Sequence, residues 1–122
     1  MQNIEWTEYG KDENYGTKLF RVVNGNIYLS WNDKFEMDVN NFLVCCANAD
    51  DIPLTDEHHT TEFVVGEDHN KTVSMSFTNN HDEGTEEQIG IVKRDGGKWD
   101  SWVRFTVQEL TNIVNVIRQH QK

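Results

Sequence analysis

Cysteine, proline and positive charge are all scarce in this sequence of 122 residues. Its two cysteines, Cys45 and Cys46, are adjacent, so they form neither a disulfide framework nor a pair of ligands at the spacing of a structural zinc site. The single proline, Pro53, lies in a polar stretch that is typical of a loop. Since no repeat, linker or low-complexity tract interrupts the sequence, we expect one domain over residues 1–122.

Lysine and arginine number 11 against 21 aspartates and glutamates, which gives a formal net charge of -10 at pH 7. A general nucleic-acid binder neutralises phosphates with an excess of Lys and Arg, so this balance disfavours that class and leaves only a local basic site. No run approaches the roughly 20 apolar residues of a membrane span. Residues 1–5 also lack the basic and apolar regions of a signal peptide, and we therefore expect a cytoplasmic protein without a membrane segment.

Recognised catalytic motifs are absent: the sequence has no Gly-rich phosphate loop, nucleophile elbow, His-Glu-x-x-His motif or spaced set of Cys and His ligands. His58 and His59, beside Asp56 and Glu57, are the nearest approach to a metal site, but adjacent histidines on an extended chain point apart. The acidic run 82–87 lacks the alternating ligands of an EF-hand loop. We therefore expect a protein that is not an enzyme and that carries no metal or cofactor.

Two segments have the pattern of β-hairpins. Leu19–Val23 and Ile27–Trp31 flank Asn24-Gly25, a pair that readily adopts the positive φ angles of a tight hairpin turn. The buried face of the second run is expected to hold Ile27, Leu29 and Trp31. A second hairpin is expected where Ile89–Arg94 and Trp99–Phe105 flank a Gly-rich turn.

Between these hairpins the pattern indicates further strands. Val73, Met75 and Phe77 alternate with serine and threonine, the period of a half-buried strand. Phe42–Cys46, within the segment 39–47, is a short apolar run that suits a strand covered on both faces, with a helix as the weaker alternative.

The last segment has the pattern of an amphipathic helix. Thr106 and Glu109 form a capping box, in which each side chain satisfies a backbone amide of the other residue. The helix should bury an apolar stripe formed by Val107, Leu110, Ile113, Val114 and Ile117. The sequence therefore predicts an α+β fold: an antiparallel β-sheet built of hairpins, with about six or seven strands, and one C-terminal helix.

Cations and aromatic rings gather at the second hairpin of an otherwise acidic chain. The cluster consists of Lys93, Arg94, Trp99, Trp102, Arg104 and Phe105. Arginine can bind phosphate with two hydrogen bonds and stack on a base, and aromatic rings are platforms for nucleobases. The alternative is that Trp99 and Phe105 belong to the core, while Arg94 and Arg104 form ordinary surface pairs with carboxylates.

The segment from Ile89 to Lys122, with this hairpin and its capping box opening a terminal helix, resembles the PC4-type coactivators. In that family a curved antiparallel sheet binds single-stranded nucleic acid and the terminal helix mediates dimerisation. The resemblance implies backbone contacts for Lys93, Arg94 and Arg104. The strongly acidic composition of this chain is a departure from the family.

In its size, order of elements, composition and lack of catalytic motifs, the chain also resembles the phage Thoeris anti-defence sponge proteins. These compact proteins assemble and sequester cyclic ADP-ribose signals that bacterial TIR-domain enzymes make. The resemblance implies a phage-encoded protein in the host cytoplasm, with a ligand pocket between subunits. The residues that it places in this pocket are Phe77, Asn79 or Asn80, Arg94, Trp99 and Arg104.

The leading hypothesis is therefore a non-enzymatic protein that sequesters a small nucleotide signal, such as a cyclic ADP-ribose isomer. We expect it to form a homodimer or higher homo-oligomer through its C-terminal helix. The alternatives are a PC4-like protein that binds single-stranded nucleic acid and an acidic DNA mimic that inhibits a host nucleic-acid enzyme.

Overall fold

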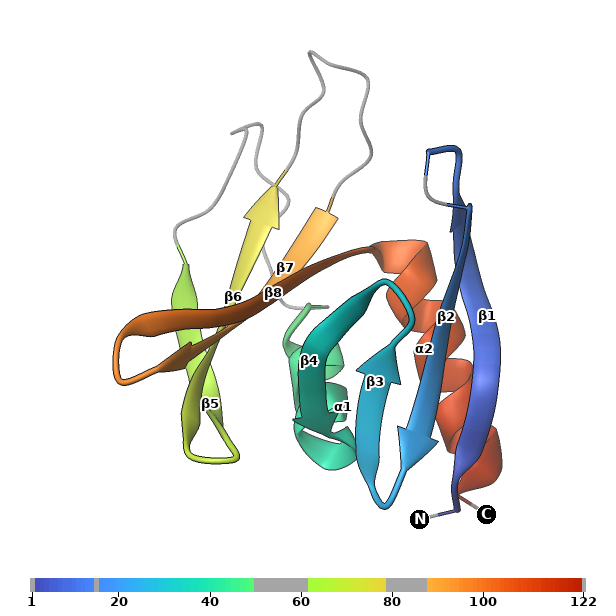
Figure 1. The fold of residues 1–122 in the computed structure, drawn as a ribbon, viewed down its shortest axis with the longest axis horizontal. Helices are drawn as coiled ribbons and strands as arrows, with labels where there is room; N and C mark the ends of the chain where they lie inside the picture. The colour runs from blue at the N-terminus through green and yellow to red at the C-terminus, as the bar shows by residue number, and fades with distance from the viewer. Residues whose placement is uncertain (1, 15, 50–61, 79–87, 122) are drawn as a thin grey trace.

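The computed structural model describes residues 2–14, 16–49, 62–78 and 88–121, and within them the chain forms two units of four antiparallel strands followed by a helix (Figure 1). The first unit contains β1 (Ile4–Asp12), β2 (Gly16–Val23), β3 (Asn26–Leu29), β4 (Asn32–Asp38) and α1 (Val39–Ala49). The second contains β5 (Phe63–Asp68), β6 (Lys71–Thr78), β7 (Gln88–Asp95), β8 (Lys98–Thr106) and α2 (Val107–His120). The expected α+β class of antiparallel hairpins with a C-terminal helix is confirmed.

The two sheets and the two helices enclose one hydrophobic core. In each sheet the strand order follows the sequence, from β1 to β4 and from β5 to β8. Helix α2 packs on β1 and β8, helix α1 packs on β3, β4 and β5, and the helices touch each other. At the centre, the Tyr9 ring lies 6.2 Å from that of Phe20 and 6.0 Å from that of Phe105, while Phe42 of α1 lies 5.8 Å from Phe105. No described helix has the length and apolar character needed to cross a membrane.

Both hairpin turns form as the sequence predicts. Asn24 and Gly25 have φ angles of 52° and 80°, and Gly96 and Gly97 have φ angles of 60° and 87°. Ile27 and Leu29 are buried as expected, but Trp31 is 41% exposed. Trp31 departs from the alternation because β3 ends at Leu29, and the chain turns there into β4.

The strand predicted over residues 39–47 is wrong, because this segment forms helix α1. The carboxylate of Asp38 accepts hydrogen bonds from the backbone N–H groups of Asn40 and Asn41, at 2.9 and 3.3 Å, and so caps the first turn. The helix buries one face, which carries Val39, Phe42 and Cys45. This spacing of three residues is helical, and the intervening apolar residues hide it in the sequence.

Helix α2 begins with the predicted capping box. The Glu109 N–H donates to the Thr106 hydroxyl at 3.1 Å, and the Thr106 N–H donates to the Glu109 carboxylate at 2.9 Å. Of the expected stripe, Leu110, Ile113 and Ile117 are buried, Val114 is half-buried, and Val107 at the start of the helix is exposed. The stripe therefore packs against the sheets of the same chain.

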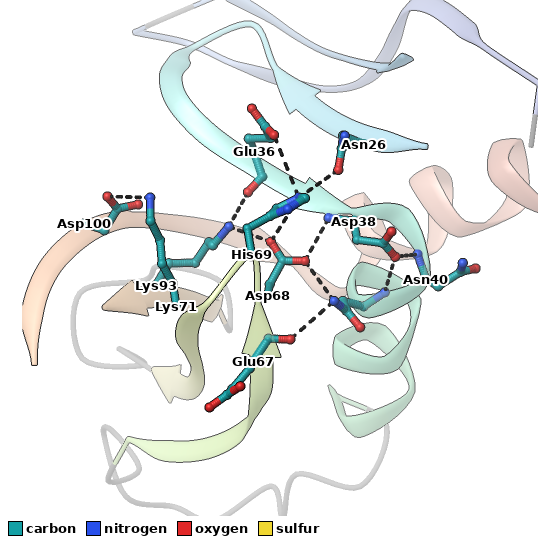
Figure 2. Close-up of polar contacts among 11 residues, drawn as sticks. Asn26, Glu36, Asp38, Asn40, Glu67, Asp68, His69, Lys71, Lys93 and Asp100 are labelled. Atoms are coloured by element: carbon teal, nitrogen blue, oxygen red, sulfur yellow. Dashed lines mark hydrogen bonds and ion pairs between the residues drawn. The ribbon is translucent and has the colours of Figure 1, made fainter. Parts of the chain in front are cut away.

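A buried ion pair within the second unit makes hydrogen bonds to the first unit (Figure 2). Lys93 of β7 places its Nζ atom 2.6 Å from Oδ2 of Asp68, at the end of β5, and the two side chains are only 4% and 0% exposed. The same ammonium group donates to the backbone carbonyl of Glu36 in β4. Lys93 thus links the second sheet to the last strand of the first.

Asp68 is satisfied by further donors from the first unit. Its Oδ1 atom accepts hydrogen bonds from the Asp38 N–H at 2.9 Å and from the Asn41 side-chain amide at 2.8 Å. Burial alone would raise the pKa of Asp68, but the hydrogen bonds from Lys93, Asn41 and Asp38 and the charge of Lys93 together hold it below its ordinary value. The carboxylate therefore stays ionised and holds β5 against the start of α1.

Replacing Lys93 with methionine should destabilise the protein strongly, because Asp68 would remain buried without its cation. We expect the free energy of unfolding, measured by urea denaturation, to fall by about 3–5 kcal/mol. Lys71→Met is the matched control: Lys71 pairs with Asp100 at 3.0 Å, but both side chains are partly exposed, so its loss should change the free energy of unfolding far less. Similar losses in the two variants would contradict a special role for the buried pair.

Candidate functional site

A groove between the two sheets, here called the inter-sheet groove, is the best candidate site. Its volume of about 350 Å³ falls in the range of small-molecule pockets. One wall comes from the ends of β1 and β2 and from the turn that leads into β4, and the other comes from β7 and β8. Among the residues that the structure describes, the lining consists of Asp12, Thr17, Lys18, Trp31, Gln88, Trp102 and Arg104.

The alternation of β8 determines which of its side chains reach this groove. Ser101, Val103 and Phe105 are buried on the inner face of the second sheet. Trp102 and Arg104, between them in sequence, therefore lie on the outer face. Along β8, side chains of the core therefore alternate with side chains that face the groove.

Glycine at position 90 makes room for Trp102. Gly90 is the partner of Arg104 in the β7–β8 pairing, and a Cβ atom on it would lie 3.0 Å from Nε1 of Trp102 and 2.7 Å from Oγ of Ser76. The guanidinium carbon of Arg104 lies 4.8 Å from the centroid of the Trp102 ring, which is a cation–π contact. Within the described residues Arg104 makes no ion pair with a carboxylate.

The side chain of Trp31 is held by a hydrogen bond to a tyrosine of the core. Its indole N–H donates to the hydroxyl of Tyr9, which is almost fully buried. Burial raises the pKa of Tyr9 well above its ordinary value, with a smaller contribution from the charge of Glu109, so the hydroxyl stays neutral even though the hydrogen bond from Trp31 opposes the shift. The hydrogen bond fixes one edge of an indole ring that is otherwise partly open to solvent.

Lys18 brings a second cation to the groove. Its Nζ atom lies 3.2 Å from Oε2 of Glu109, the residue that caps α2. Lys18 already pairs with Glu109 and the lining also holds Asp12, so Arg104 is the cation of the described lining that forms no ion pair with a described carboxylate, and it lies beside the aromatic rings. Such a lining suits a planar ring that carries an anionic group.

The residues expected to contact a ligand have different positions. Arg94, Trp99 and Arg104 all lie on the outer face of the second sheet, but only Arg104 lines the groove. Trp99 is 61% exposed beyond it. Phe77 is 2% exposed in the core, because the alternation of β6 turns it inward with Val73 and Met75. Asn79 and Asn80 lie outside the described residues.

Arg94 forms the surface pair that was the alternative interpretation. Its Nε and Nη2 atoms donate to the two carboxylate oxygens of Glu62 at 3.1 and 2.9 Å. These hydrogen bonds hold the pKa of Glu62 below its ordinary value and raise the pKa of Arg94. Arg94 is therefore already occupied by a carboxylate.

Sequence reasoning missed the wall of the groove that the first sheet forms, and it missed Gln88 on the opposite wall. On the first wall Trp31 was expected in the core, and Asp12, Thr17 and Lys18 were not singled out. No motif links these residues, since the fold alone brings the ends of β1 and β2 beside β7 and β8.

Other features offer less as a site. A cavity of about 280 Å³ between α1 and α2 has no aromatic ring in its described lining. Burial raises the pKa of Cys45 to about 12, so its thiol stays protonated. Among the residues that the structure describes, no three His, Cys, Asp or Glu side chains could hold a metal ion together. His58, His59 and the run 82–87 lie outside these residues.

Gly90→Ala tests how the groove is built. The added Cβ would press on Trp102 and Ser76, so we expect the indole N–H resonance of Trp102 to shift in a ¹H–¹⁵N correlation spectrum while the fold is retained. Ser76→Ala is the control, because it alters the other neighbour of Gly90 without adding an atom near the indole. An unchanged Trp102 resonance in Gly90→Ala would contradict the packing described.

Comparison with known proteins yields no relative: no protein-family model, no curated protein and no solved structure matches this chain.

Proposed function

We propose that this protein binds a nucleotide in the inter-sheet groove without transforming it. The observation that supports the proposal is the meeting of Trp31, Trp102 and Arg104 in one cavity, with Lys18 beside them. A base stacked on an aromatic ring gains about 1–3 kcal/mol. The arginine supplies charge-assisted hydrogen bonds to a phosphate group. The described lining contains no histidine, cysteine or serine, which favours binding over turnover.

The charge distribution favours a small ligand. A chain with a net charge of -10 repels a polyanion over most of its surface, whereas a single nucleotide needs only the local cations of the groove. Cyclic ADP-ribose isomers and cyclic dinucleotides belong to this class. We propose that the protein sequesters a signal of this kind.

The groove lies within one chain, so this function does not require a second copy. The buried stripe of α2 is also satisfied inside the chain. A homodimer through α2 therefore remains a separate proposal, which sedimentation equilibrium can decide.

Isothermal titration calorimetry with a panel of mononucleotides, cyclic dinucleotides and cyclic ADP-ribose isomers tests the proposal. For the nucleotide that binds, Trp31→Ala and Arg104→Ala should each weaken binding by about 5- to 150-fold, since each removes a contact of about 1–3 kcal/mol. Trp99→Ala should leave the affinity unchanged, because Trp99 is exposed on the same sheet but outside the groove. Absence of heat with every member of the panel would overturn the proposal.

Single-stranded nucleic acid is the second candidate, and the positions of two tryptophans favour it. Trp99 and Trp102 share the outer face of the second sheet, opposite Arg94 and Val92, which are two residues apart on β7. Two residues of a strand span about 7 Å, twice the 3.4 Å between stacked bases. Each indole ring could therefore stack on one base of a single-stranded nucleic acid whose bases are separated from one another.

Trp99→Ala distinguishes the two candidates. If a strand lies along β8, fluorescence anisotropy with a labelled oligonucleotide should show binding that weakens about 5- to 150-fold in this variant. The logarithm of the affinity should also fall linearly with the logarithm of salt concentration, with a slope of about -0.7 per phosphate contacted. An affinity for the oligonucleotide that changes neither with salt concentration nor in Trp99→Ala would exclude this candidate.

A further inference from the structure

We infer that the cavity between α1 and α2 is a second binding site, which takes a free fatty acid of medium chain length. The inference is independent of the proposed nucleotide binding, because this cavity and the inter-sheet groove share no described lining residue. It rests on the chemistry of the lining, on the shape of the cavity and on the position of one arginine.

Most of the described lining of this cavity is aliphatic. One hydroxyl belongs to it, that of Thr111, and this group donates to the backbone carbonyl of Val107 at 2.9 Å, so its donor is satisfied within α2. A planar base finds no aromatic ring to stack on among the described side chains here. A flexible alkyl chain needs none, because it gains free energy by leaving water for an apolar surface. The aliphatic residues of the lining include Leu43, Ala47, Ile89, Val107, Leu110 and Val114.

The cavity is elongated along helix α2. Val107, Thr111, Val114 and Arg118 follow one another at spacings of four, three and four residues, which places them along one face of the helix. At a rise of about 1.5 Å per residue, this face extends about 16 Å from Val107 to Arg118. A volume of about 280 Å³ spread over that length makes a channel only a few ångströms across.

A channel of this width excludes a partner helix. A helix with its side chains is about 10–12 Å in diameter, and α1 and α2 already touch each other, so no third helix fits between them. A single chain of methylene groups does fit. Because an extended chain advances about 1.2 Å per bond, about 12 carbon atoms span the distance from Val107 to Arg118.

Arg118 supplies the positive charge at one end of the channel. No carboxylate belongs to the described lining, and none of the described carboxylates forms an ion pair with Arg118. A guanidinium group has five N–H donors in a planar fork that matches the two oxygens of a carboxylate. One cation at the end of an aliphatic channel thus complements an alkyl chain that ends in one carboxylate.

Calorimetry with hexanoate, octanoate and decanoate on the whole chain tests the inference. Each addition of two methylene groups should tighten binding by about 15-fold, since each methylene group that leaves water contributes a similar increment. Decylamine has the same chain length as decanoate but a positive head group. It should bind about 10-fold more weakly or worse, because its ammonium group cannot pair with Arg118.

A matched pair of variants tests the channel. Ala47→Phe places a ring in it and should weaken decanoate binding by about 10-fold or more, because the ring displaces several methylene groups from the channel. Val44→Phe adds the same ring at an exposed position of α1 outside this cavity and should leave the affinity unchanged.

A second pair of variants tests the charge. Arg118→Gln should weaken decanoate binding by about 10-fold without weakening that of decylamine. Lys34→Gln removes the same charge from an exposed position of β4 outside the cavity, so it should change neither affinity.

Three results would overturn the inference: no heat with decanoate, equal affinities for decanoate and decylamine, or an unchanged decanoate affinity in Ala47→Phe. A dimer in sedimentation equilibrium that Ala47→Phe dissociates, in the absence of any alkanoate binding, would instead assign the cavity to an interface between copies of this chain. Nucleotide binding is a separate measurement, so its failure would leave this inference standing, and failure of decanoate to bind would leave the proposed function standing.

Discussion

The buried ion pair between Asp68 and Lys93 holds the two halves of this protein in register through its hydrogen bonds to the first unit. Removing two charges from water is costly, and a buried pair is tolerated only when its remaining hydrogen-bonding groups are satisfied. Here the carboxylate receives donors from β7, the end of β4 and the first turn of α1, and the ammonium group also reaches a carbonyl of β4. Neither sheet can shift against the other without leaving one of these groups unpaired.

The inter-sheet groove depends on that registration, because neither unit contains it alone. The first unit contributes Trp31 and Lys18, and the second contributes Trp102 and Arg104. Beside the groove, the side-chain amide of Asn32 in β4 donates a hydrogen bond of 3.1 Å to the backbone carbonyl of Trp102 in β8, which joins the two sheets directly. A ligand that bound between two sheets held by such contacts would order fewer groups, and this would lower the entropic cost of its binding.

Local signals in the sequence predicted most of the secondary structure. The turns at Asn24-Gly25 and Gly96-Gly97 and the capping box at Thr106 each depend on a few adjacent residues. Strand β1 gave no clear signal because irregularities near Ile4 and Gly10 interrupt its alternation. Helix α1 was mistaken for a strand because a short apolar run suits both structures. Arg104 was predicted from its neighbours in sequence, whereas Trp31 and Lys18 meet it only through tertiary packing.

Glu109 connects the groove with the start of the C-terminal helix α2. One oxygen of its carboxylate caps helix α2, and the other pairs with Lys18 in the groove. An anion that bound Lys18 would compete with Glu109, so occupancy of the groove would be coupled thermodynamically to the order of the first turn of α2, equally in both directions. A substitution that weakened the first turn of α2 would then also change the affinity of the groove for such an anion.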